Sequence, residues 1–269
     1  MIDDAFYQVV TGGQSQNSEK EKMIHKLRLP NIIVKSFVLG VFLFTSQSQA
    51  EGGFGIDVTR IIFLQDKAAT TVSVRNTTTN IPYLVTTKIT RTVDGKGKAP
   101  FYVTPPLFRL DPKGTNVLRI LGDTSKLPTD RESVFYFNAS AIPGSNNPPS
   151  QRFEETKIGG GITYAIGNTI KLFYRPTGLV GTPEQAYKAL RFTHASGGVQ
   201  VSNNSPYHIS FTQIKVDGVP VKFSESHPQM LAPFSSHVYP AQNNQNKKKV
   251  EWAVISDLGG GENFNGEIQ

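Results

Sequence analysis

Few residues in this sequence have the types and spacing that catalysis or metal binding requires. No cysteine is present, which excludes disulfides, thiolate metal ligands and cysteine nucleophiles. The histidines form no His-Glu-x-x-His pair, and a lone histidine near the end of a strand is usually a polar surface residue. The five are His25, His194, His208, His227 and His237. We therefore expect no metal site.

Patterns for phosphate binding, acyl transfer and nucleic-acid binding are absent as well. The glycine triplets at 159–161 and 259–261 lack the Lys-Ser/Thr pair that follows a phosphate loop. No Gly-x-Ser-x-Gly turn occurs. The basic run 247–249 lies in a polar loop, which is typical of a solvated hairpin. We expect a protein that is not an enzyme, needs no cofactor and binds no nucleic acid.

Three tripeptides fit the Asn-x-Ser/Thr pattern of a glycan acceptor. They begin at Asn76, Asn138 and Asn203. Because such tripeptides recur by chance, the pattern alone assigns no modification.

The composition is that of a folded protein with a basic surface. At about 100–200 residues per domain, the 269 residues suggest one large or two modest domains. With 38% hydrophobic and 18% charged residues, packed cores are expected rather than disorder. The formal net charge of +7 at pH 7 leaves open nucleic acid, an anionic surface or a partner with a negative group.

The first 50 residues have the features of a secretory signal. An apolar run at 32–44 is preceded by Lys26 and Arg28 and is interrupted by Lys35. A membrane anchor is the alternative, but the run is shorter than the ~20 residues that a spanning helix needs. We therefore expect an exported chain without stable membrane insertion.

Small residues mark where this signal ends. Ser48 and Ala50 predict cleavage after Ala50, and Met23 stands where such a signal normally begins. We expect a signal region at 1–50, with the signal itself at 23–50. Its removal leaves a net charge of +6.

Beyond residue 50, short apolar runs alternate with turn residues. Several runs have period two, such as Val72 and Val74, or Val250, Trp252 and Val254. Strand signals at this spacing, with Gly, Pro and Asn between them, are typical of β-sandwiches. The predicted strands are 61–64, 70–75, 83–89, 101–104, 116–120, 133–139, 162–166, 170–174, 190–193, 199–202, 209–216, 219–223, 237–239 and 250–255.

The number of these strands suits two sandwiches better than one. The Pro- and Gly-rich stretch 175–183 carries no strand signal, so we expect domains at 51–176 and 177–269. The only helical signal is at 184–190.

Several blocks of residues, in a fixed order, resemble a known family. In the first half they are 101–110 (Phe-Tyr-Val-Thr-Pro-Pro-Leu-Phe-Arg-Leu), 127–138, 141–143 and 170–176 (Ile-Lys-Leu-Phe-Tyr-Arg-Pro). In the second half they are 201–207, 230–234 and 250–257. The chain resembles the PapD-like periplasmic chaperones of the chaperone–usher pathway over residues 54–258.

The resemblance implies an all-β fold of two immunoglobulin-like β-sandwich domains set at an angle, with a cleft between them. It implies a periplasmic chaperone that binds fimbrial, pilus or adhesin subunits and folds them by donor-strand complementation. Such a chaperone delivers the subunits to an outer-membrane usher. Whether the empty protein self-associates is left open.

The resemblance also implies an anchor for the C-terminal carboxylate of the bound subunit. It corresponds to Arg60 and Lys171 in this chain. Two cations can hold one carboxylate through charge-assisted hydrogen bonds. Lys171 stands between Ile170 and Leu172 in an otherwise apolar strand, which favours a specific purpose over a surface role.

The last strand of the first domain is expected to complete the sandwich of the subunit. Its apolar residues alternate with small or polar ones, as β-augmentation requires. They are Ile158, Ile162, Tyr164 and Ile166. An edge strand this apolar is an aggregation hazard without a partner.

Three further residues match the ionic contact between the two domains of the family, namely Glu132, Arg175 and Asp257. We expect their role to be structural. The remaining motif residues, such as Pro105, Pro106 and Phe234, are expected in turns and in the core.

The connection before the donor strand resembles that of a long-loop subclass, since 26 residues separate Pro143 from Ile170. That subclass usually has a cysteine near each end of the loop, whereas Asn138 and Thr169 occupy the corresponding positions here. The alternative to a chaperone is a secreted immunoglobulin-like structural or adhesive fibre component. Such a subunit needs a donor extension or a missing strand, which the complete predicted strand set argues against.

Overall fold

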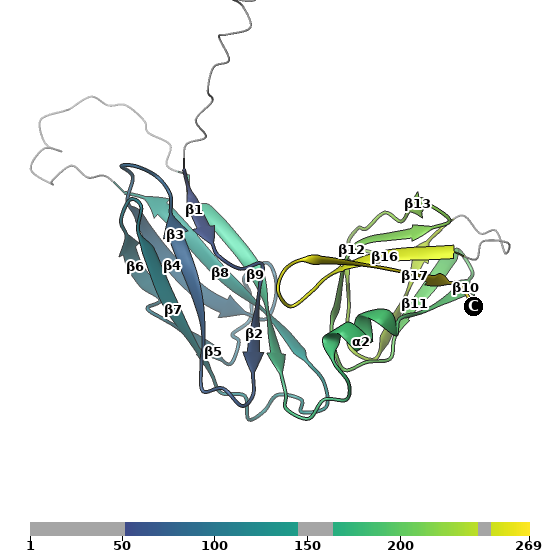
Figure 1. Cartoon of the computed structure of the whole chain (residues 1–269). Helices are drawn as coiled ribbons and strands as arrows, with labels where there is room; N and C mark the ends of the chain where they lie inside the picture. Colours follow the sequence, from purple (N-terminus) through teal and green to yellow (C-terminus); the bar gives the residue numbers. More distant parts are fainter. Residues whose placement is uncertain (1–51, 145–163, 242–248) are drawn as a thin grey trace, which may run out of the picture. The chain divides into compact units, whose positions relative to one another are not determined.

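The computed structural model describes residues 52–144, 164–241 and 249–269. Nearly all of its elements are β-strands (Figure 1). The expected signal region 1–50 and the expected donor residues Ile158 and Ile162 lie outside the described residues. Within the described ranges, no helix combines the length and the apolar character needed to cross a membrane.

Two sheets build the first sandwich. One has the order β1 (Phe54–Ile56), β3 (Thr70–Asn76), β7 (Thr115–Gly122), β5 (Phe101–Thr104). The other has the order β2 (Arg60–Leu64), β9 (Ile166–Arg175), β8 (Ser133–Pro143), β4 (Tyr83–Thr90), β6 (Leu107–Leu110). The strands alternate as predicted, so that Tyr83, Val85 and Ile89 of β4 are buried. Edge-to-face contacts join Phe63, Phe101 and Phe135 in the core between the sheets.

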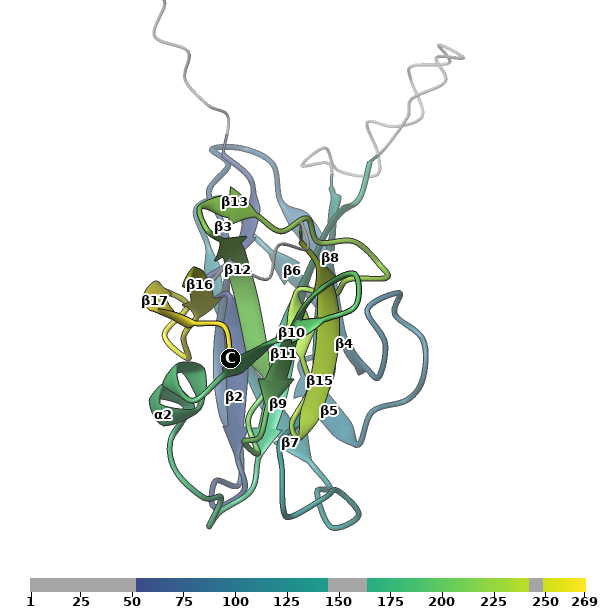
Figure 2. The same cartoon turned by 90° about the vertical axis from the view of Figure 1, so that its right-hand side faces the viewer.

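The second sandwich also has two layers, which Figure 2 shows from the side. One sheet has the order β10 (Arg191–Ala195), β11 (Gly198–Asn203), β15 (Ser235–Pro240). The other has the order β13 (Val219–Pro220), β12 (Ile209–Val216), β16 (Lys249–Ile255), β17 (Gly261–Glu267), with β14 (Met230–Leu231) also paired to β12. A separate core fills it, which includes Phe192 and Trp252. The two cores confirm the expected all-β fold of two sandwiches.

The helix between the sandwiches is α2 (Pro183–Lys188), close to the predicted position. Thr182 caps its N-terminus, since Thr182 Oγ1 accepts from Gln185 N and Gln185 Oε1 accepts from Thr182 N. The indole Nε1 of Trp252 donates to the carbonyl of Tyr187 at 3.0 Å, which fixes α2 on the second core.

The chain changes sheets at residues 57–59, and this change leaves part of β9 without a neighbour. β1 pairs with β3 in one sheet, whereas β2 begins at Arg60 in the other and runs parallel to β9, with Arg60 opposite Lys171. β8 covers the other side of β9 along residues 166–174. Among the strands that the structure describes, none pairs with residues 166–170 on the β2 side. We call these residues the free edge of β9.

Four observed strands, β1, β6, β14 and β17, are absent from the prediction, although β1 and β6 are short strands with large apolar residues. β17 was not predicted, because Gly261–Glu267 holds one large apolar residue, Phe264, which stacks on Trp252. The predicted break between 162–166 and 170–174 is wrong, since β9 continues through Gly167, Asn168 and Thr169, held by their pairing with β8. Pairing with a neighbouring strand overrides weak β-propensity.

Asn76 and Asn203 hold equivalent turns in the two sandwiches, and each is 1% exposed. The amide of Asn203 donates to the carbonyls of Tyr207 and Ala232 at 2.7 and 2.9 Å, and its Oδ1 accepts from the backbone and hydroxyl of Ser205. Asn76 bonds in the same way to Thr78 and to carbonyls of neighbouring segments. These side chains are therefore structural, which accounts for the asparagine of both tripeptides without a modification.

Replacing Asn203 by alanine removes bonds to two buried carbonyls and to the Ser205 backbone. We expect Asn203→Ala to lower the free energy of unfolding by about 2–3 kcal/mol. Urea unfolding measures this change. The neighbouring Asn204 is exposed, and Asn204→Ala serves as the control, with an expected change below about 0.5 kcal/mol. Equal effects of both substitutions would contradict the assigned role.

Candidate functional site: two unpaired cations beside an ionic contact

Arg60 and Lys171 lie side by side, because they are directly opposite each other on the parallel strands β2 and β9. Within the described residues neither forms an ion pair with a carboxylate at 4.0 Å or less. Burial lowers the pKa of Lys171, and the charge of Arg60 lowers it further. Two neighbouring positive charges without an anion form a ready site for a carboxylate.

Arg60 is unusually buried for a cation, with 7% of its surface exposed. Its Nε atom has no hydrogen-bond partner, and its Cζ atom lies 5.6 Å from the centroid of the Phe173 ring. Burial lowers the pKa of Arg60, although nearby Asp257 and Glu132 oppose this. A buried N–H group without a hydrogen-bond partner raises the free energy of the protein. An anion that accepts a hydrogen bond from Arg60 would therefore bind favourably.

Lys171 is oriented from the second sandwich. Its Nζ atom donates to the hydroxyl of Ser210 at 3.4 Å, and Ser210 is a buried residue of β12. The cation pair therefore stands on strands of the first sandwich but is contacted by the second. Sequence reasoning missed Ser210, because nothing in the apolar run of β12 marks it.

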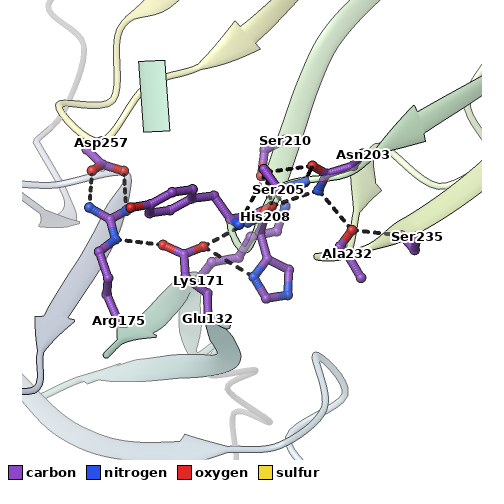
Figure 3. A network of polar contacts seen from close by, with 11 residues as sticks. Glu132, Lys171, Arg175, Asn203, Ser205, His208, Ser210, Ala232, Ser235 and Asp257 are labelled. Atoms are coloured by element: carbon purple, nitrogen blue, oxygen red, sulfur yellow. Dashed lines mark hydrogen bonds and ion pairs between the residues drawn. The ribbon is translucent and has the colours of Figure 1, made fainter. Parts of the chain in front are cut away.

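The structure places Arg175 between Glu132 and Asp257, as Figure 3 shows. Arg175 Nε donates to Glu132 Oε1 at 2.7 Å, and its Nη1 and Nη2 donate to the two Asp257 oxygens at 2.6 and 3.0 Å. The last residue of β9 is thus joined to the residue before β8 and to the turn after β16. This contact ties the first sandwich to the second.

Glu132 completes this contact on its other side. Its Oε2 accepts from the backbone N–H of His208 at 2.8 Å and lies 3.3 Å from His208 Nδ1 (Figure 3). Burial alone would lower the pKa of Arg175, but the hydrogen bonds and charges of Asp257 and Glu132 raise it well above its usual value. Arg175 is therefore always charged. His208 is a second contact residue that the sequence did not reveal.

Phe234 lies in a turn, one of the two expected environments, and not in a core. It is 50% exposed, has a φ of 53° and lies with its ring centroid 5.0 Å from Arg131 Cζ. The cation–π contact with Arg131 adds to the link between the two sandwiches. The motif Leu-Ala-Pro-Phe at 231–234 does not indicate that the side chain of Phe234 is exposed.

Of the expected donor residues, the described part of the chain contains Tyr164 and Ile166. They are 73% and 40% exposed. Ile166 lies opposite the buried Ala141, so it shares the strand face whose later residue Leu172 packs in the first core. Apolar side chains on this face therefore continue beyond the end of that core.

Asn138 and Thr169 are directly opposite each other on β8 and β9. The Thr169 hydroxyl donates to Asn138 Oδ1 at 2.9 Å. A hydrogen bond thus joins the two positions that correspond to the cysteines of the long-loop subclass. It links β8 and β9 near the end of the free edge, two residues before Lys171.

The ionic contact predicts a specific loss of stability. Glu132→Gln removes a charge from a group whose side chain is 2% exposed, so Arg175 loses one of its two anions in a desolvated site. We expect the free energy of unfolding to fall by about 3 kcal/mol, measured by urea unfolding. Asp130→Asn is the control, since the Asp130–Arg131 pair is exposed and should contribute less than about 1 kcal/mol. A control effect as large as that of Glu132→Gln would contradict the assigned role.

Comparisons with known proteins agree on one family. Residues 53–180 match the pili and flagellar-assembly chaperone family, PapD N-terminal domain. Residues 185–265 match the pili assembly chaperone PapD, C-terminal domain. The probable fimbrial chaperone protein ElfD of Escherichia coli K12 is 33% identical over 229 residues, which cover 84% of this chain and 92% of ElfD.

Solved structures show the same relationship. The E. coli chaperone DraB has a TM-score of 0.68 at 30% identity, covering 82% of this chain and 98% of DraB. A chain from the Salmonella enterica SafA pilin in complex with the SafB chaperone has a TM-score of 0.67 at 28% identity, covering 81% of this chain and 97% of that chain. With both domains matched in order, the chain belongs to the PapD family of pilus-assembly chaperones.

Proposed function

We propose that this periplasmic fimbrial chaperone holds an unfinished pilus subunit along the free edge of β9, with the subunit's C-terminal carboxylate between Arg60 and Lys171. The observation that carries the proposal is the position of the two unpaired cations. They lie where β2 begins and where the free edge of β9 ends. A strand that pairs with the free edge therefore brings its end directly to them.

The geometry also sets the direction of the bound strand. β2 runs parallel to β9 and begins at Arg60. A subunit strand that occupies the vacant position ahead of β2, and ends with its carboxylate at Arg60, must run in the same direction as β2. It therefore pairs with β9 in parallel. The carboxylate fixes its register.

Alternate side chains of β9 and of the residues before it would fill the groove of the subunit. Tyr164 is 73% and Ile166 40% exposed, and Ile158 and Ile162 continue the same alternation in the sequence. Each large apolar group gains roughly 1.5–3 kcal/mol when fully buried. The backbone of the free edge supplies the hydrogen bonds.

This function requires no catalysis, cofactor or nucleotide. The chaperone stabilises the subunit by completing its sandwich and then passes it to an outer-membrane usher. The pilin complex of the SafB chaperone supports this kind of partner. A removable signal within residues 1–50 would bring the chain to the periplasm. The alternative, a structural or adhesive fibre component, does not account for the buried Arg60 and the half-buried Lys171, which have no carboxylate partner among the described residues.

Charge reversal tests the anchor. In Lys171→Glu the introduced carboxylate can pair with Arg60, so the protein stays folded while the site for the subunit is lost. We expect subunit binding to weaken at least about thirtyfold. The readout is the amount of subunit that co-purifies with tagged chaperone from periplasmic extracts.

Lys222 is exposed, and Lys222→Glu provides the control with the same change in charge. It should leave the complex intact. Survival of the complex in both Lys171→Glu and Arg60→Glu would refute the anchor.

A second test addresses the free edge. Tyr164→Asp combined with Ile166→Asp places charges on the donor face, and we expect subunit binding to be lost. Because both residues are exposed, the melting temperature of the empty chaperone should change by less than about 2–4 °C. The exposed Val219 is the control, as Val219→Asp should affect neither property. A large drop in melting temperature with retained binding would indicate a core role instead.

A further inference from the structure

Two histidines of the second sandwich face each other at hydrogen-bond distance. His227 Nδ1 lies 3.2 Å from His237 Nε2, and the ring centroids are 5.5 Å apart. Both side chains are partly buried. They stand ten residues apart in the sequence, which is not a spacing that indicates a histidine pair. The fold therefore brings together two imidazoles that the sequence pattern gave no reason to pair.

Tyr239 contacts the surroundings of both histidines and holds them in place. Its ring lies edge-on to the ring of His237, with the centroids 4.8 Å apart. Its hydroxyl donates to the carbonyl of Pro228, the residue after His227, at 2.8 Å. Burial raises the pKa of Tyr239 to about 12, so the phenol stays protonated and remains a donor.

Each histidine is also fixed through its own backbone. His237 belongs to β15, where it lies opposite Val201 of β11. His227 closes a turn with Ser224, in which the two residues exchange backbone hydrogen bonds at 3.0 and 3.1 Å. The hydroxyl of Ser224 also accepts from His227 N at 3.2 Å. The two rings therefore need little rearrangement to keep their nitrogens directed at a common point.

The distance between the two nitrogens suits neighbouring ligands of one metal ion. Zn²⁺ binds imidazole nitrogen at about 2.0–2.1 Å in tetrahedral sites, which places two such nitrogens about 3.3–3.4 Å apart. In the metal-free protein the observed 3.2 Å is a hydrogen bond, in which one ring donates its N–H group to the other. A metal ion would take the place of this proton, because a histidine nitrogen must be deprotonated to bind a metal.

We propose that His227 and His237 bind one divalent transition-metal ion, of the class Cu²⁺, Ni²⁺ or Zn²⁺. Imidazole suits these ions, whereas Mg²⁺ and Ca²⁺ prefer oxygen ligands. Within the part of the chain that the structure describes, no group of three or more potential ligand side chains lies together. The protein therefore supplies two ligands and water completes the coordination. Cu²⁺ is expected to bind most tightly.

The bound ion would join two separate segments of the second sandwich. His227 belongs to the connection between β13 and β14, residues 221–229, which contains no strand or helix. His237 belongs to β15. A metal bridge would hold this connection on β15 and stabilise the folded protein. Because both ligands come from the second sandwich alone, the inference does not depend on the anchor at Arg60 and Lys171.

A titration with Zn²⁺ tests the site, using protein without a polyhistidine tag at about pH 7.5, where free histidines are neutral. Competition with a chromogenic chelator gives the Kd. We expect one Zn²⁺ to bind with a Kd of about 100 μM or less, and His227→Ala and His237→Ala each to weaken binding at least about tenfold. His194 is exposed on β10, and His194→Ala is the control that should change the Kd less than about twofold.

NMR of the wild-type protein identifies the ligands without relying on the variants. The ring-proton signals of His227 and His237 should shift with Zn²⁺, and those of His194 and His208 should not. Zn²⁺ at about 100 times its Kd should raise the melting temperature by at least about 3 °C, and that of His227→Ala by less than about 1 °C. A Kd above about 100 μM, or an equal Kd in the wild-type protein and both variants, would show that the two rings only share a hydrogen bond.

Discussion

The ionic contact of Arg175 is the interaction on which the rest of this molecule depends. Arg175 is the last residue of β9, and it binds Glu132 of its own sandwich and Asp257 of the other. Four residues before it on the same strand stands Lys171, next to Arg60. By holding Arg175 in place, this contact also determines which groups of the second sandwich lie next to Arg60 and Lys171. On the same side of the molecule, Ser210 contacts Lys171 and Gly259 packs on Thr59, so two further contacts between the sandwiches accompany it. Buried ion pairs specify geometry more surely than they stabilise a fold.

The cation pair and the free edge are each unfavourable in an empty protein, and together they describe a partner. A buried arginine whose donor has no hydrogen-bond partner is stabilised by an anion. An open strand edge is stabilised when another strand pairs with its backbone groups. In the proposed function both needs are met by one ligand, a β-strand that ends in a carboxylate. The exposed side chains of Tyr164 and Ile166 would then fill a groove of the partner that carries this strand. The cation pair, the free edge and the exposed apolar side chains are each unfavourable in the unbound protein. In the proposed function, each gains its partner when the subunit binds.

Much of the fold could be predicted from local pattern, and two of the failures, at β17 and in the middle of β9, have the same cause. Alternation with period two located strands such as β3, β4 and β16 because each has one buried face. β17 was missed, since its place is decided by pairing with β16 rather than by its own polar residues. The continuation of β9 through Gly167 and Asn168 depends likewise on β8. Asn76 and Asn203 looked like glycan acceptors, and only the positions of the carbonyls around them identify them as buried links between turns.

The sequence by itself determined most of the strands, because alternation of apolar residues is a local pattern. Its motifs also indicated the family, and that resemblance identified the residues of the cation pair and of the ionic contact. Only the tertiary structure decided that Arg60 stands opposite Lys171. It also decided that, within the described ranges, the two have no carboxylate partner and residues 166–170 have one side without a strand. It alone placed His208, Ser210 and Phe234. The physical reason is that strand register and contacts between sandwiches join residues far apart in the chain, and no local pattern records which of them meet.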